Sequence, residues 1–174
     1  FHIEKYDSVN ELALIWVLLP KVNPADKTAH FWLYYGNDTA TPVAEGGTGW
    51  DSRTTAIFHF SEKALLRDAS AKKVTASGDI SVQKTALLGE AAIFKGSALR
   101  IEPNPALTLK TGGDFTYSAW IRSGPLPQQA ALYNQGPLSI SIDEQKLTLT
   151  SGGATIAGGE VKASAWQHIA ATAS

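Results

Sequence analysis

The stretch from residue 56 to residue 174 consists of short runs in which apolar and polar side chains alternate, separated by turns rich in glycine and proline. The clearest run is DFTYSAWIRS, residues 114–123. One face of it carries Phe115, Tyr117, Ala119 and Ile121, and the other carries Thr116, Ser118, Trp120 and Arg122. A period of two residues is typical of a half-buried β-strand. A regular series of such strands predicts an all-β chain built as a sandwich or barrel.

Further strands are expected on both sides of this run. They cover residues 56–60, 92–94, 98–101, 138–142, 147–149 and 164–174, with Ile156 in another strand of the same meander. Tyr133 and Asn134 are expected in a loop, because the residues around them are rich in Gly, Pro and Gln. Residues 61–73 contain a plausible helical turn, which is too short to change the fold class.

The first fifty residues hold two other apolar runs. In ELALIWVLLP, residues 11–20, both alternating faces are apolar, which favours a strand buried on both sides over a competing helix. Residues 30–37, HFWLYYGN, alternate aromatic side chains and end in Gly-Asn, as a strand does before a turn. The polar residues 38–55 are interpreted as a linker between a small strand-rich unit, residues 1–50, and a sandwich, residues 51–174.

Composition excludes several classes of protein. Charged residues make up 18% of the 174 residues and the net charge is -1, so no basic surface exists to bind nucleic acid. The chain has no cysteine, which excludes zinc–thiolate sites and disulfides. No apolar run is long enough to cross a bilayer as a helix. Because the chain lacks methionine and starts with FHIEKYD, we expect it to be a piece of a longer protein.

Five segments of the second part follow one another in a recognisable order: AIFHFSE, RDASA, ALLGEAAIFKGSALRIEPNPALTL, GDFTYSAWIRS and AWQHIAATAS. This series resembles the laminin-G and concanavalin A-like domains of bacterial surface proteins, which implies an antiparallel jelly-roll sandwich. Such domains continue beyond the last segment, so the sandwich is expected to be incomplete at its C-terminal end. Proteins rarely leave a sheet edge unpaired. We therefore expect the N-terminal strands, or a second copy of the chain, to cover the edge at residues 166–172.

The first part carries an apolar run that ends at Pro20 and, later, YYGN at residues 34–37. These features resemble DUF2341, a small bacterial domain that normally begins upstream of Phe1 and commonly precedes a laminin-G-like domain. The pair also occurs in envelope proteins related to the ExbB/TolQ/MotA proton-channel family. The resemblance implies a membrane-anchored parent protein and a location on the periplasmic or extracellular side of a bacterial membrane.

Catalytic residues are not evident in the sequence. Glycoside hydrolases need two carboxylates that flank the scissile bond, whereas Asp143 and Glu144 are adjacent and belong to the expected turn of a hairpin. No nucleophile-elbow motif is present. His59 and His168 are expected to be half-buried, hydrogen-bonded structural residues within strands. We predict that the chain is not an enzyme.

Metal ligands are also sparse. His2 and His30 have no acid or second histidine at the spacing of a zinc motif, so we expect no zinc site. Calcium is the one cofactor considered, because lectin-like folds often bind it through several oxygen ligands. Asp68 is the best single candidate for a calcium ligand. The alternative is that Asp68 caps a turn by accepting hydrogen bonds from backbone amides.

A carbohydrate site would need exposed aromatic rings with polar neighbours. The candidate ligand-binding residues are three aromatic residues and one polar neighbour, namely Trp120, Tyr133, Trp50 and Asn134. Trp120 shares its strand face with polar side chains, and Trp50 lies at the edge of the linker. The alternative for Trp120 is that its ring packs against a second sheet or a covering loop.

These features favour a non-catalytic recognition module outside the cytoplasm, with a glycan or an envelope protein as its partner and with pairing through an edge strand as a route to a dimer. One alternative is a structural spacer without a small ligand. The other is a degenerate glycosidase-like enzyme.

Overall fold

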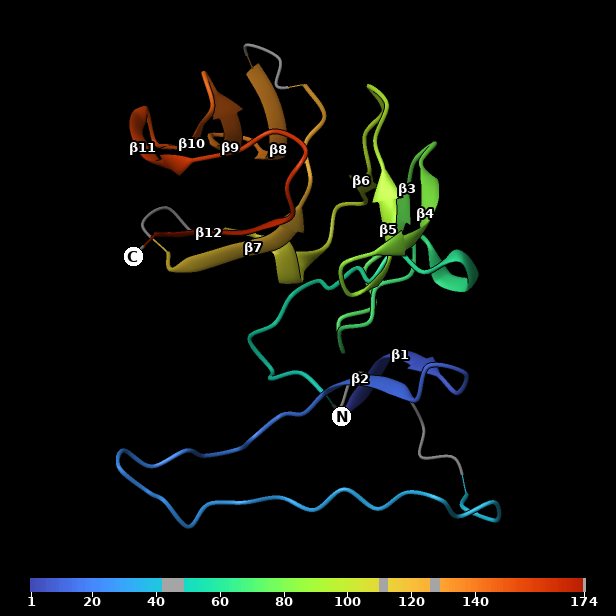
Figure 1. Ribbon diagram of the computed structural model, residues 1–174. Coiled ribbons are helices and arrows are strands. Elements are labelled where there is room, and N and C mark those ends of the chain that lie inside the picture. Colours follow the sequence, from blue (N-terminus) through green and yellow to red (C-terminus); the bar gives the residue numbers. More distant parts are fainter. Residues whose placement is uncertain (42–48, 110–112, 126–128, 174) are drawn as a thin grey trace. The chain divides into compact units, whose positions relative to one another are not determined.

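The computed structural model describes residues 1–41, 49–109, 113–125 and 129–173 (Figure 1). The chain is 42% strand and 4% helical. All strand pairs among the described residues are antiparallel. The predicted all-β, antiparallel class is therefore confirmed. The chain forms two compact units, Phe1–Leu107 and Thr108–Ser174, which we call unit 1 and unit 2.

The strands described in unit 1 are short and pair two by two. The pairs are β1 (His2–Asp7) with β2 (Leu12–Trp16), β3 (Ala76–Ser77) with β6 (Arg100–Ile101), and β4 (Ser81–Ala86) with β5 (Gly89–Ile93). The expected strands at 92–94 and 98–101 correspond in part to β5 and β6. Two 3-10 turns accompany them, η1 (Glu62–Ala64) and η2 (Pro105–Leu107), and η1 falls within the expected helical turn.

Strand β2 was expected to be longer and buried on both faces, and this prediction is wrong. The strand ends at Trp16, and residues 17–20 have no regular structure. Leu12 and Trp16 are each 41% exposed. The physical reason is that β2 pairs with β1 alone among the described strands. A strand with two apolar faces is buried only when other elements pack on both faces of its sheet, and a two-stranded hairpin does not provide them.

The aromatic run at residues 30–37 does not form the predicted strand. The described part of the chain from residue 17 to residue 41 contains no strand and runs as an extended trace (blue to cyan in Figure 1). Its alternating pattern carries strand propensity, but a strand also needs a hydrogen-bonded neighbour, and no described strand pairs with it. Of the expected linker at residues 38–55, residues 42–48 lie outside the described residues.

The predicted strand at residues 56–60 is also wrong. Only an isolated bridge between Phe58 and Asp68 forms there. The left-handed backbone of Phe60, with φ of 57°, ends the extended conformation after one bridge.

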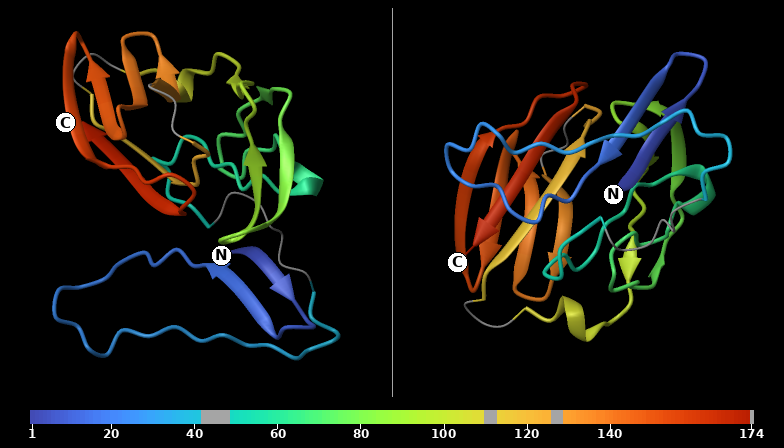
Figure 2. Two further views of the ribbon diagram at one scale, coloured as in Figure 1. Left: turned by 45° about the horizontal axis from the view of Figure 1, so that its top comes forward. Right: turned by 90° about the horizontal axis from the view of Figure 1, so that it is seen from below.

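Unit 2 is a pair of antiparallel sheets (Figure 2). One has four strands in the order β11 (Ala154–Glu160), β10 (Lys146–Ser151), β9 (Leu138–Asp143) and β8 (Gln129–Gln135). The other pairs β12 (Gln167–Ala173) with β7 (Phe115–Ile121). The predicted strands at 138–142, 147–149 and 164–174 are confirmed, with their ends shifted by a few residues.

The core of unit 2 lies between these two sheets. Its buried members are Leu138, Ile140 and Leu149 from the four-stranded sheet and Ala171 from β12. On β7 the predicted alternation is confirmed: Phe115 and Tyr117 pack on this core, whereas Trp120 is 44% exposed. A strand with one apolar face therefore places that face against the opposing sheet.

Three tight hairpin turns connect the four strands of the meander, and the first of them is formed by Gly136 and Pro137. Asp143 pairs with Lys146, which leaves Glu144 and Gln145 as a two-residue loop with φ of 45° and 67°. Positive φ at both positions defines a type I′ turn, whose twist matches that of the flanking strands. Gly152 and Gly153 form the next turn, also with positive φ. The predicted hairpin turn at Asp143 and Glu144 is confirmed.

The outer edge of β12 was expected to be covered by the N-terminal strands or by a second copy of the chain. Within the described residues of unit 2, β12 pairs with β7 alone. The register of this pair runs from Ile121↔Gln167 to Phe115↔Ala173. Both forms of coverage stay predictions.

Candidate functional site

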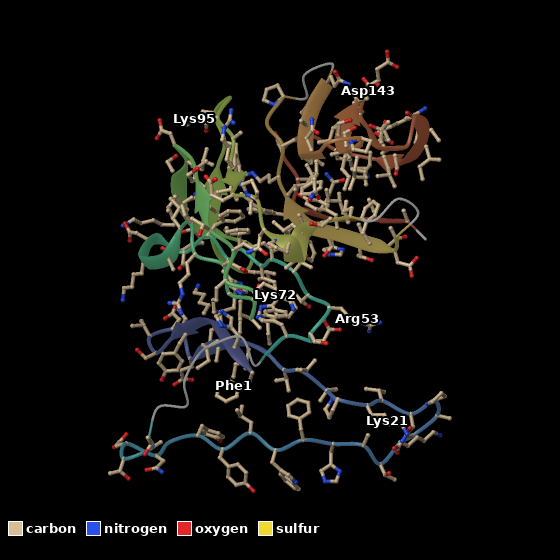
Figure 3. The ribbon with its side chains drawn as sticks, turned by 180° about the vertical axis from the view of Figure 1, so that it is seen from behind. Phe1, Lys21, Arg53, Lys72, Lys95 and Asp143 are labelled. Carbon is tan, nitrogen blue, oxygen red and sulfur yellow. The ribbon has the colours of Figure 1, made fainter. Side chains whose placement is uncertain are left out.

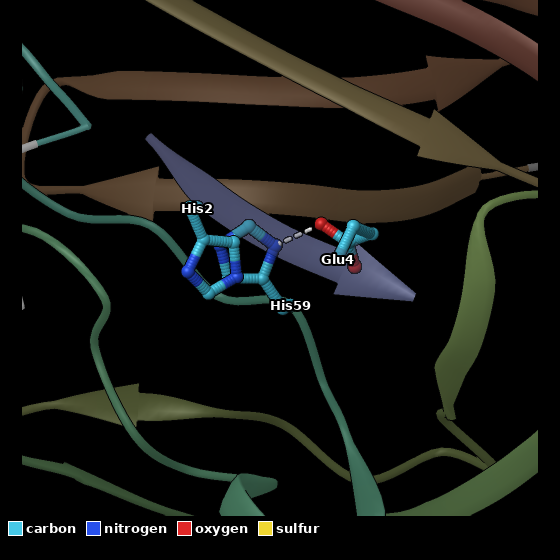
Figure 4. A group of neighbouring side chains, drawn as sticks. All are labelled: His2, Glu4 and His59. Atoms are coloured by element: carbon cyan, nitrogen blue, oxygen red, sulfur yellow. Dashed lines mark ion pairs between the residues drawn. The ribbon is translucent and has the colours of Figure 1, made fainter. Parts of the chain in front are cut away.

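Strand β1 and the segment around residue 59 bring three polar side chains together in unit 1 (Figure 4). His2 and Glu4 are two residues apart on β1, so their side chains project from the same face of the strand. His59 approaches them from the irregular segment next to the Phe58–Asp68 bridge. Each residue offers one ligand-type atom, and these atoms all lie within 4.8 Å of one another. The cluster therefore combines two imidazoles with one carboxylate.

Glu4 is the electrostatic centre of this cluster. Its Oε2 forms an ion pair with His59 Nδ1 and accepts a hydrogen bond from Trp16 Nε1 at 2.9 Å. The side chains of Glu4 and His59 are only 9% and 16% exposed. Burial raises the pKa of Glu4, but the hydrogen bonds from His59 and Trp16 and the charge of the histidines outweigh it and hold the pKa below its ordinary value. Glu4 is therefore a carboxylate at neutral pH.

Aromatic rings surround the two imidazoles. The rings of His2 and His59 are stacked, with centroids 4.2 Å apart and planes 15° apart. Trp50 lies beside His59 at a centroid separation of 5.9 Å, and Trp16 lies 5.6 Å from Trp50. Because His2 is opposite Trp16 in the pairing of β1 and β2, the hairpin accounts for the positions of these two rings, whereas Trp50 and His59 come from a later segment.

A cavity of about 320 Å³ opens at this cluster within unit 1. Its walls include His2, Glu4, Trp50 and His59, together with Lys63, Arg67 and Lys73. The three basic side chains are exposed, so they form a cationic rim around an aromatic wall. A flat ligand with a negative charge matches this combination, because its ring can stack while its charge meets the rim.

The four sequence-predicted ligand residues are divided between the two units. Trp50 lies in the cavity of unit 1, and Trp120, Tyr133 and Asn134 belong to unit 2. A ligand site that these residues share stays a prediction. Tyr133 and Asn134 lie in strand β8 and not in the expected loop, because β8 pairs with β9 through this region. Asn134 is exposed, and Tyr133 packs on the core while its hydroxyl donates to Gln135 Oε1 at 2.6 Å.

Trp120 lies on the face of the β7–β12 pair opposite to the core residues of β7. Its ring contacts that of His168, its partner across the strand pair, at a centroid separation of 5.3 Å. Of the two expected structural histidines, His168 lies in β12 but is exposed, and His59 is largely buried but lies outside any strand. The expected strand position is therefore confirmed for His168 alone, and the expected partial burial is confirmed for His59 alone.

Asp68, the candidate calcium ligand, is 2% exposed and fully engaged. Its Oδ1 accepts from the amides of Ile57 and Ser70, and its Oδ2 accepts from the Ser70 hydroxyl and the Val74 amide, all at 2.7–2.9 Å. A carboxylate has about four lone-pair positions. All four are used by the protein, so the structure favours the turn-capping alternative over a calcium site.

Sequence reasoning missed the cluster of His2, Glu4 and His59. Its signal is the spacing His-x-Glu on a strand, which puts an imidazole and a carboxylate on one face. The partner His59 could not be predicted, because it lies more than fifty residues away and outside a regular element. By contrast, Asp143 and Glu144 lie at the exposed end of a hairpin, as expected.

No helix in the described parts of the chain is long and apolar enough to span a membrane. Searches among curated proteins and among solved structures found no match to this chain. Residues 1–67 match the model of a domain of unknown function, DUF2341, as the features at Pro20 and YYGN had indicated. The match extends beyond residue 50, where the boundary between the two expected domains was placed; that boundary stays a prediction. The first 67 residues of the chain are thus similar to DUF2341.

Proposed function

We propose that the chain is a non-catalytic recognition module whose partner is a protein, bound through the apolar segment at residues 31–35. The observation that carries this proposal is the exposure of five consecutive large side chains. The exposed fractions are 61% for Phe31, 75% for Trp32, 63% for Leu33, 89% for Tyr34 and 90% for Tyr35. Contiguous apolar surface of this kind marks interaction sites, because water contact with it is unfavourable.

The burial pattern of unit 1 supports the same conclusion. Val74 is the one hydrophobic residue among its described residues that is buried, whereas unit 2 has a core of several. Other apolar side chains of the same extended trace, Val17 to Leu19, are 42–46% exposed. Figure 3 shows this trace, which carries Lys21, with rings projecting along its length. A partner that covers the segment would supply the apolar contacts that unit 1 lacks.

Strand addition is the binding mode that fits this segment best. Residues 30–37 have the alternation and β-propensity of a strand, yet their backbone pairs with no described strand. An extended segment of this type pairs with the exposed sheet edge of another protein, through main-chain hydrogen bonds and side-chain pockets. Aromatic residues strengthen such interfaces, since Trp and Tyr supply most binding energy at hot spots.

The wider setting of the module is proposed from resemblance. The match of the first part to DUF2341 supports a laminin-G-like, jelly-roll arrangement for the second part. It also supports a parent protein anchored in a bacterial envelope, related to the ExbB/TolQ group, with this module on the periplasmic or extracellular side. The exposed hairpin position of Asp143 and Glu144 favours a binding role over hydrolysis. A passive spacer would leave residues 31–35 without any partner.

An acidic glycan is the second candidate ligand, and it is favoured by the cavity of unit 1. Trp50 offers a flat face for a sugar ring, and Lys63, Arg67 and Lys73 offer positive charge for a uronate or sialate carboxylate. A glycan array that includes acidic and neutral sugars tests this candidate. Binding of acidic glycans that is lost in Trp50→Ala and kept in Trp120→Ala supports it.

Site-specific photo-crosslinking tests the proposed protein partner. A photoreactive residue is placed at Trp32, in the exposed segment, or at Val9, an 89% exposed apolar position in the turn after β1. After irradiation in envelope extracts, the proposal predicts one adduct protein from position 32 that is absent from position 9. That protein is then purified and titrated with the unlabelled chain.

Two substitutions decide whether the adduct reports specific binding. The proposal predicts that Trp32→Ser combined with Tyr34→Ser weakens the purified complex by about 100-fold, the loss of two aromatic anchors. Val9→Ser leaves the affinity unchanged. The same adducts from both positions, an adduct with only a second copy of this chain, or an unchanged affinity in the double variant contradicts the proposal.

A further inference from the structure

One nitrogen of the His59 ring has no partner among the described residues. Its Nδ1 faces Glu4 Oε2 in the ion pair, whereas its Nε2 is buried without a hydrogen bond. Buried polar atoms in folded proteins are nearly always paired, so this atom requires an explanation. When the His59 ring is neutral, one of its two nitrogens carries no proton, and the lone pair of that nitrogen is available to a cation.

We propose that His2, Glu4 and His59 form a binding site for a divalent transition-metal cation of the zinc type. Two imidazoles and a carboxylate are the donor set that such cations prefer. Calcium and magnesium are disfavoured, because they select sites made of oxygen ligands. The inference concerns the cluster on β1 and is independent of the protein partner proposed for residues 31–35.

The geometry of the cluster is close to that of a bound site. The three ligand-type atoms lie within 4.8 Å of one another, whereas two ligands on a tetrahedral zinc ion stand about 3.4 Å apart, given bonds of about 2.1 Å. Small side-chain movements are therefore enough to adjust these separations to those of a bound site. The stacked rings of His2 and His59 cannot both aim their in-plane lone pairs at one ion, so one ring turns out of the stack.

The surroundings of the cluster suit a cation with an open coordination position. Trp16 fixes Glu4 by its hydrogen bond at 2.9 Å, which holds the carboxylate beside His59. Three protein ligands would leave a fourth position on the ion, and the cluster lines the same cavity as Lys63, Arg67 and Lys73. The positive charges of these three side chains disfavour a second metal ion and favour water or an anion as the fourth ligand.

Titration of the full chain with Co²⁺ and Zn²⁺ tests the proposal. Calorimetry measures the stoichiometry, and the visible absorption of Co²⁺ reports its coordination by nitrogen and oxygen ligands. We expect one equivalent of Co²⁺ to bind with a four- or five-coordinate spectrum, and one equivalent of Zn²⁺ to displace it. The absence of both heat and spectrum overturns the proposal.

Matched histidine variants assign the site. His59→Gln is expected to lower the Co²⁺ affinity by at least about 100-fold, beyond the ~10- to 100-fold typical for loss of a supporting hydrogen bond alone. His168→Gln, at an exposed position of β12, leaves it unchanged. Binding that survives His59→Gln, or that is lost in His168→Gln, shows that surface histidines bind the metal and overturns the assignment.

A second variant covers the case in which His59→Gln fails to fold, as judged by its circular dichroism. Glu4→Gln keeps an oxygen that accepts from Trp16 but removes the negative charge. We expect it to fold and to lose at least about 10-fold in Co²⁺ affinity. An unchanged affinity in a folded Glu4→Gln variant also overturns the proposal.

Discussion

The backbone amide of Ile57 donates a hydrogen bond of 2.8 Å to the carboxylate of Asp68, eleven residues later in the chain. The same carboxylate accepts from Ser70 and from the amide of Val74, at 2.9 Å. One buried side chain thus joins three stretches of unit 1, a region with little apolar core. Local polar bonds, more than hydrophobic burial, hold this part of the chain together.

Replacing Asp68 with alanine is expected to destabilise the chain by roughly 3 kcal/mol, because the buried amides of Ile57 and Val74 lose their acceptor. Urea unfolding monitored by tryptophan fluorescence measures the change. Asp26→Ala is the matched control: Asp26 accepts from the amides of Thr28 and Ala29 in the same way but is exposed to solvent. A loss as large in Asp26→Ala as in Asp68→Ala would show that burial is not the cause.

Acid is expected to weaken the contribution of Asp68. Burial raises the pKa of this carboxyl, but the hydrogen bonds from Ile57, Ser70 and Val74 outweigh it and hold the pKa below its ordinary value. The unfolded side chain titrates near pH 4, at about 3.9. Because the folded pKa is the lower one, the stabilisation is complete above about pH 4 and is lost as pH falls through the folded pKa.

The Asp68→Asn variant isolates this titration. The difference in free energy of unfolding between the native chain and Asp68→Asn should be largest near about pH 7 and should shrink below about pH 4. Urea unfolding over that range measures it. A difference that stays constant or grows in acid contradicts the assignment of the low pKa to Asp68.

Residues that favour positive φ are expected to stabilise the turn between β9 and β10. Glu144 and Gln145 have φ of 45° and 67°, which side chains other than Asn and Gly adopt at a cost. Glu144→Asn together with Gln145→Gly should stabilise unit 2 by about 0.5–1 kcal/mol in urea unfolding. Gly153→Ala, at φ of 86° in the neighbouring turn, should instead destabilise it. The opposite signs would contradict the two turn assignments.

The core of unit 2 depends on Ile140, which is 0% exposed between the sheets. Ile140→Ala should cost about 2–5 kcal/mol, the range for a deleted core side chain. Ile156→Ala provides the control in the same sheet, because Ile156 is 63% exposed on β11 and its loss should change stability by less than about 0.5 kcal/mol. Equal losses in thermal unfolding would indicate that another element buries Ile156.

The strands of the second half of the chain were easier to predict from the sequence than those of the first half, for a physical reason. The alternation in β7, β9 and β10 is local, and each strand finds its partner across a turn of a few residues or within the same unit. Pattern and pairing therefore agree. The aromatic residues at 31–35 show the opposite case: their pattern indicates a strand, but pairing requires a neighbour that the described chain does not contain.

The candidate site was beyond prediction for a related reason. Glu4 and His2 share a strand face that spacing can reveal, but the approach of His59 depends on an irregular segment fixed by the Phe58–Asp68 bridge. Asp68 shows that residue type alone does not determine a role, because an acidic side chain in a loop can either bind a cation or accept hydrogen bonds from backbone amides. Only the positions of the amides of Ile57 and Val74 distinguish these two roles.

Amide hydrogen exchange of residues 31–35 is the most direct test of the proposal that this segment awaits a protein partner. In the chain alone, these amides should exchange at nearly the rate of an unstructured peptide, while those of β7 are protected. In the complex with the crosslinked partner, their exchange should slow by at least about 10-fold, as strand pairing requires. Protection in the chain alone equal to that of β7, or no change on complex formation, would contradict the account.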